Sequence, residues 1–79
     1  MELRQLRHFV AVVDKGNLSR AADRVAISQP ALTRSIQALE DELGGRLFDR
    51  LGRRIALTPF GHEVLQRASR LVADAEALK

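Results

Sequence analysis

The chain has 79 residues, with 13 Lys or Arg against 10 Asp or Glu, a net charge of +3 and no cysteine. This length allows one domain at most, and the lack of cysteine excludes both a disulfide framework and a thiolate metal site. No apolar run approaches the ~20 residues of a membrane span, and the charged N-terminus argues against a signal peptide. A chain this short forms only a small core, so its stability requires close helix packing, a partner chain, or both.

The first third of the chain predicts two helices. Apolar residues at helical spacing indicate a helix from Leu3 that ends near Gly16. A short second helix follows, and either Asn17 or Ser19 can cap it. Its apolar face carries two alanines, which let another helix approach closely; this face consists of Leu18, Ala21, Ala22 and Val25.

A third helix is predicted over residues 28–43. Ser28 is a good N-cap, and Pro30 lies in the first turn, where its missing N–H costs nothing. One apolar stripe runs along the helix, and a polar face lies away from it. The stripe is Leu32, Ile36, Leu39 and Leu43, and the polar face carries Gln29, Thr33, Arg34 and Gln37.

The remainder predicts a hairpin over residues 47–57 and then a long helix over residues 59–79. Two β-prone runs flank Leu51–Gly52, which is typical of a hairpin turn. Thr58 and Pro59 then form a cap followed by proline at the first helical position. The long helix carries a row at alternating spacings of four and three, with Leu65 and Val72 beside it; the row is Val64, Ala68, Leu71, Ala75 and Leu78.

This order of elements predicts a mainly α fold: a winged helix-turn-helix of three helices and a two-stranded wing, followed by a long dimerisation helix. The turn has the required small residue at Ala22, an apolar closure at Ile27 and a buried position at Leu32. It departs from the usual pattern at Ala26, where glycine is often found; alanine there costs stability if φ is positive.

Basic charge concentrates in residues 46–54, where four arginines against Asp49 give +3. A solvated basic loop and a surface that faces phosphates both fit this pattern, and composition does not choose between them. The arginines are Arg46, Arg50, Arg53 and Arg54.

A series of short motifs follows in a fixed order, and together they resemble a known family. They are Ser19-Arg20-Ala21-Ala22, Ser28-Gln29-Pro30-Ala31-Leu32, Ile36-Gln37-Ala38-Leu39-Glu40, Leu43-Gly44, Leu47-Phe48, Arg50, Arg53-Arg54 and Leu57-Thr58-Pro59-Phe60-Gly61. The chain resembles the N-terminal DNA-binding domain of LysR-type transcriptional regulators. Two positions depart from that pattern: Leu51 replaces a small polar residue and Gly45 a larger one.

The resemblance implies a bacterial, cytoplasmic transcription factor that binds double-stranded DNA as a homodimer, or as a tetramer when full-length. It divides the chain into a DNA-binding domain over residues 1–58 and a linker helix over residues 59–79. It also implies that a small-molecule effector binds a C-terminal domain absent from this chain, so no cofactor is expected here.

Contacts with bases are expected mainly from the N-terminal end of the third helix, which would enter the major groove. Gln29 can pair with adenine, Pro30 can contact a thymine methyl, and Arg34 can reach guanine or a phosphate. Thr33 can reach a base or a phosphate, and the resemblance gives Arg53 of the wing a minor-groove contact.

Contacts with phosphates are expected from two serines and two arginines. Ser19 and Ser28 offer hydroxyl and N–H groups at helix starts, although each also fits a purely capping role. Arg50 and Arg54 fit phosphate contacts or ion pairs with Asp49 or residues 40–42.

The row from Val64 to Leu78 predicts a dimer seam, so the DNA target is expected to be an inverted repeat. The alternative is that this face packs only on the chain's own domain. A helical protein–protein module that binds no DNA remains a second function, whereas no nucleophile–base pair or phosphate loop supports an enzyme. His8 and His62 stand alone, so no metal site is expected.

Overall fold

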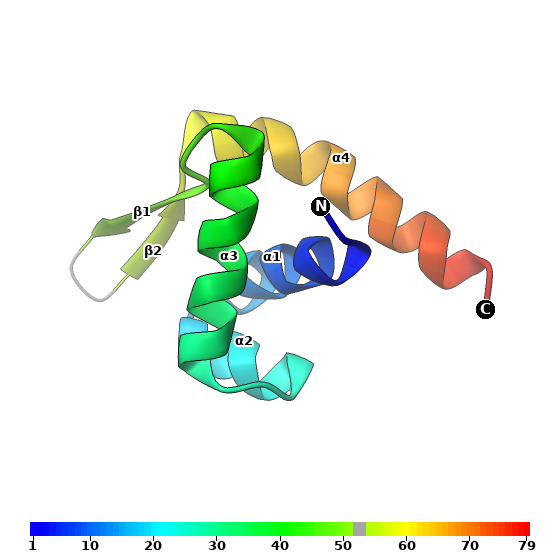
Figure 1. Ribbon diagram of the computed structural model, residues 1–79, viewed down its shortest axis with the longest axis horizontal. Coiled ribbons are helices and arrows are strands. Elements are labelled where there is room, and N and C mark those ends of the chain that lie inside the picture. Colours follow the sequence, from blue (N-terminus) through cyan, green and yellow to red (C-terminus); the bar gives the residue numbers. More distant parts are fainter. Residues whose placement is uncertain (52–53) are drawn as a thin grey trace.

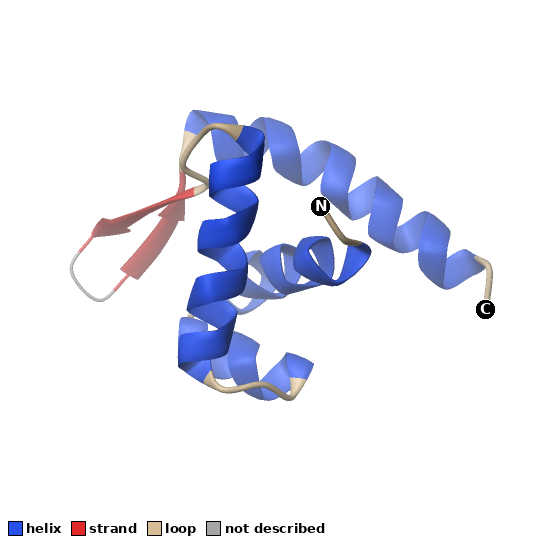
Figure 2. Cartoon of the chain, in the orientation of Figure 1, coloured by secondary structure: helices blue, strands red, loops and turns tan. Residues whose placement is uncertain are grey.

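The structure is a computed structural model that describes residues 1–51 and 54–79. Its elements follow the predicted order, which confirms the mainly α, winged helix-turn-helix class (Figures 1 and 2). The last helix ends at Ala77, two residues before the predicted end, because the final N–H groups bond in a tighter turn to Ala75 and Glu76. The elements are α1 (Leu3–Lys15), α2 (Leu18–Val25), α3 (Gln29–Leu43), β1 (Phe48–Leu51), β2 (Arg54–Leu57) and α4 (Pro59–Ala77).

Local capping explains where the helices begin. Asn17 accepts the N–H of Arg20 at 3.0 Å, so Asn17 and not Ser19 caps α2. Ser28 accepts the N–H of Ala31 at 3.2 Å at the start of α3, and Thr58 accepts that of Gly61 at 2.9 Å at the start of α4.

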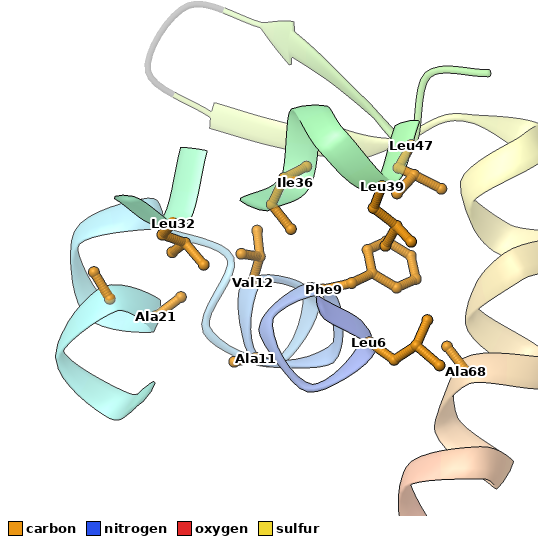
Figure 3. Packing of buried hydrophobic residues seen from close by; sticks show 11 residues of the cluster. Leu6, Phe9, Ala11, Val12, Ala21, Leu32, Ile36, Leu39, Leu47 and Ala68 are labelled. Carbon is orange, nitrogen blue, oxygen red and sulfur yellow. The ribbon is translucent and has the colours of Figure 1, made fainter. Parts of the chain in front are cut away.

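The core lies where α1, α2 and α3 meet, with the wing and α4 closing one end (Figure 3). Phe9 is fully buried at its centre and packs on Phe48 with ring centroids 5.4 Å apart. Ala21 and Ala22 are buried beside α3, as the close helix crossing requires. Val12, Leu32, Leu39 and Leu47 are also fully buried.

A polar contact also joins α1 to α3 inside the fold. The Nδ1 atom of buried His8 lies 2.7 Å from the hydroxyl of Ser35. Burial lowers the pKa of His8 below its usual 6.5, and the nearby Arg4 guanidinium lowers it further. The folded chain therefore favours the neutral imidazole.

α4 crosses over α1 and leads away from the body, on the side opposite the wing (Figure 1). Arg7 of α1 forms an ion pair with Glu76 near the end of α4. No helix among residues 1–51 and 54–79 is long and apolar enough to cross a membrane.

Candidate nucleic-acid interface

The first turn of α3 points away from the core. Gln29, Pro30 and Arg34 are exposed, and Thr33 is half-buried. The side chain of Ser28 is engaged as the N-cap acceptor, while its hydroxyl hydrogen remains available for donation. The first turn of α3 thus presents polar side chains and unsatisfied N–H groups on one exposed surface.

Side chains of three elements, α2, α3 and the wing, meet at one groove on this surface. Ser19 lies in the first turn of α2, Gln29 begins α3, and Arg50 and Arg54 come from the wing. The groove is completed by Asn17, Leu18 and Ile55. Four residues predicted to contact DNA therefore line a single groove, with two positive charges and no acidic side chain among the lining residues.

The position of Ser19 bears on its role. Because Asn17 supplies the cap, the exposed Ser19 hydroxyl is not the capping acceptor of α2. Its backbone N–H lies in the first turn, where no intrahelical acceptor exists. Both groups suit a phosphate oxygen.

A second groove adjoins the first between α3 and the root of the wing. Thr33 and Arg50 line it, together with Gln37 and Arg46, for which the sequence predicts no DNA contact. Gln37 is exposed and follows Gln29 and Thr33 at intervals of four residues. That spacing was a usable signal, because it puts the three side chains on one helix face.

Arg34 lies apart from these grooves. Its side chain lines a separate depression toward the start of α1, with Arg4, Gln5 and Ser35 among its neighbours. Arg34 therefore lies on a different side of α3 from Arg50 and Arg54.

The charged residues of the two wing strands are exposed to solvent; they are Asp49, Arg50 and Arg54. In its register Arg50 pairs with Ile55, and Leu51 pairs with Arg54. Leu51 is 63% exposed, which makes the end of β1 apolar. Among the described residues, no ion pair ties Arg50 or Arg54 to Asp49 or to residues 40–42. The predicted minor-groove residue Arg53 lies outside the described residues.

The predicted seam on α4 does not form one outward row. Ala68 is only 1% exposed and packs beside Leu6 of α1, which corrects its assignment to a dimer seam (Figure 3). Val64 is half-buried against the same core, as are Leu65 and Val72. The outward-facing members are Leu71, 50% exposed, and Leu78, 90% exposed, with Ala75 half-buried between them.

The side chains at this site can recognise a ligand through hydrogen bonds. Within the described part of the chain, no group of three or more His, Asp or Glu side chains could hold a metal ion. The lining groups are amide, hydroxyl and guanidinium donors, which suit base edges and phosphate oxygens.

Comparisons with known proteins agree with this geometry. Residues 3–62 match a family described as bacterial regulatory helix-turn-helix protein, lysR family. The chain is 55% identical over 78 residues to the SDS degradation transcriptional activation protein of Pseudomonas sp. (strain ATCC 19151), covering 99% of this chain and 26% of that relative. The name of that relative describes a transcriptional activator, which argues against an enzymatic activity.

Solved structures are similar over nearly the whole chain. The crystal structure of the CbnR_DBD-DNA complex has a TM-score of 0.91 and 47% identity, and the match covers 98% of this chain and 88% of that one. The BenM_DBD/catB site 1 DNA complex has a TM-score of 0.93 and 46% identity, covering 99% and 88%. Both structures contain a protein bound to DNA.

Proposed function

Because this chain belongs to the LysR family of bacterial regulatory helix-turn-helix proteins, we propose that it is the DNA-reading part of a transcriptional regulator. Residues 1–58 form the DNA-binding domain in this proposal, and residues 59–79 form the linker and dimerisation helix. The chain spans 26% of the length of the curated relative described above. Binding of a small-molecule effector is accordingly proposed for a C-terminal domain beyond these residues.

One observation carries the proposal: Ser19, Gln29, Arg50 and Arg54 line one groove although they come from three elements. Two guanidinium groups lie beside the exposed first turn of α3, and no acidic side chain lines the same groove. This arrangement suits a duplex, because phosphates flank the groove into which a recognition helix is inserted. Gln29, Pro30, Thr33 and Arg34 then face base edges, while Ser19, Ser28, Arg50 and Arg54 face the backbone.

In this proposal two copies of the chain associate to bind DNA. The exposed Leu71 and Leu78 suit a second copy of α4, which would place two α3 helices on two half-sites. An inverted-repeat DNA target follows from that symmetry. Such a regulator acts in the bacterial cytoplasm, where the chromosome lies, as a homodimer or as a tetramer of the full-length protein.

The test is selection of duplexes from a random-sequence pool by the wild-type chain, followed by affinity measurements with Gln29→Ala. We expect the substitution to cost about 1–3 kcal/mol on the selected duplex and little on a shuffled duplex, because a bidentate base contact is lost. Gln66→Ala, at an exposed position of α4, is the matched control and should leave both affinities unchanged. Equal losses by Gln29→Ala on both duplexes would refute its role in base recognition.

A further inference from the structure

The wing leaves the body immediately after α3, and one side chain of α3 holds the point where it begins. The carboxylate of Glu40, in the last turn of α3, accepts the N–H of Leu47 with its Oε2 atom at 2.7 Å. Glu40 is half-buried, and Leu47 is fully buried next to Leu39 (Figure 3). A bond from a carboxylate is stronger than one between neutral groups.

Thr58 holds the same segment from the other side. Its N–H donates to the carbonyl of Leu47 at 3.0 Å, and its hydroxyl donates to the carbonyl of Arg46 at 2.5 Å. Residues 46–47 are therefore fixed between the end of α3 and the start of α4. In Figure 1 this junction is the place where both strands of the wing join the body.

Such a junction determines where the wing arginines lie. Arg50 follows Leu47 by three residues, a distance of roughly 10 Å along an extended strand. A tilt of about 10° at the junction would move Arg50 by about 2 Å, more than the roughly 0.5 Å that precise recognition tolerates. The groove shared by Arg50 and Gln29 thus depends on the junction.

The charge of Glu40 makes a direct role with DNA unfavourable. Its side chain lines the groove that also contains Thr33, Arg46 and Arg50, and a carboxylate there repels phosphates. Its contribution must then be geometric.

We infer that Glu40 is a positioning residue that couples the recognition helix to the wing and so sets Arg50 and Arg54 relative to Gln29. This inference rests on the proposed DNA-binding function. It assigns Glu40 a role distinct from that of a solvated member of the acidic run at residues 40–42.

Two neutral variants separate the hydrogen bond from the charge. Glu40→Ala removes the acceptor, and we expect it to weaken binding to the wild-type-selected duplex about tenfold. Glu40→Gln keeps an oxygen that accepts the Leu47 N–H, and we expect its affinity within about threefold of wild type. Asp41→Ala removes the same charge from the exposed neighbouring position and should leave affinity equal or slightly higher.

The outcomes are distinct. Because loss of a negative charge by itself favours DNA binding, an affinity of Glu40→Ala equal to or above that of Glu40→Gln overturns the inference alone. A wild-type chain that selects no preferred duplex overturns the proposed function and this inference with it. Circular dichroism establishes that each variant is folded.

Amide hydrogen exchange measured by nuclear magnetic resonance keeps the inference falsifiable if Glu40→Ala does not fold. The Leu47 amide hydrogen, which donates to the Glu40 carboxylate, should exchange more slowly in the wild-type chain than in Glu40→Asp, whose shorter side chain does not reach it. Equal exchange rates of the Leu47 amide in the two chains would overturn the coupling.

Discussion

The turn between α2 and α3 depends on the backbone of a single residue. Ala26 ends α2 with φ 60° and ψ 42°, and it is the one non-glycine residue with positive φ in the described chain. The left-handed region costs an L-residue about 1–2 kcal/mol. The turn holds because the N–H groups of Ala26 and Ile27 bond back to α2 and because Ile27 packs on the core. The expected cost of alanine at this position thus has a structural basis.

We predict that Ala26→Gly raises the free energy of unfolding by about 0.5–1 kcal/mol, because relief of the strained φ exceeds the entropic cost of glycine. Chemical denaturation measures the change. The matched control is Ala73→Gly on the exposed side of α4, which should lower stability by about 1 kcal/mol since glycine is a poor helix former. A loss of stability in both variants would contradict the prediction.

At the scale of the element, α4 has two faces with different tasks. Its inner face buries Ala68 against Leu6 of α1, and an ion pair of Arg7 with Glu76 joins its far end to α1. Its outer face leaves Leu71 half exposed, where an apolar side chain gains little from its own domain. A small residue inside and a large one outside let one helix both close the core and offer a contact to a second chain.

We predict that Leu71→Glu gives a folded monomer while the wild-type chain is a dimer, because a carboxylate on the outer face cannot be buried against a partner helix. Sedimentation velocity measures the mass, and circular dichroism monitors the fold. Ala73→Glu introduces the same charge at an exposed position of α4 outside the depression around Leu71 and should leave the dimer intact. A dimer that persists in Leu71→Glu would place the interface elsewhere.

At the scale of the whole molecule, the modest net charge of +3 conceals an uneven distribution. Arg50 and Arg54 project with Ser19 and Gln29 at one groove, whereas Glu76 and Arg7 neutralise each other where α4 meets α1. A duplex approaching from the side of the wing therefore meets a more basic surface than the overall charge indicates.

We predict that Arg54→Ala lowers affinity for selected and shuffled duplexes alike, and reduces the slope of log affinity against log salt by about 1, because one phosphate contact is lost. Fluorescence anisotropy at several salt concentrations measures that slope. Arg24→Ala, which removes an exposed arginine of α2 that lies outside this groove, should leave the slope unchanged. An unaltered slope in Arg54→Ala would exclude a phosphate contact there.

Much of the fold could be predicted because its boundaries are chemically local. Gly16 stops α1, Ser28 starts α3, and Thr58 with Pro59 starts α4, each through groups within four residues of itself. The polar face of α3 could also be predicted, because the spacing of Gln29 and Thr33 places both side chains on one face of a helix. Whether these residues contact bases remains a prediction.

By itself the sequence determined the order of the elements, the caps of α3 and α4 and the polar face of the third helix, because helix geometry depends on neighbours within about one turn. Only the structure decided that Asn17 and not Ser19 caps α2, and only its tertiary contacts decided that Ala68 faces inward and that Glu40 holds Leu47. Ala68 and Leu71 belong to one row on α4 by their spacing, and the position of α1 determines which of the two is buried. Likewise the groove shared by Gln29 and Arg50 arises from residues far apart in the chain, whose proximity no local pattern encodes.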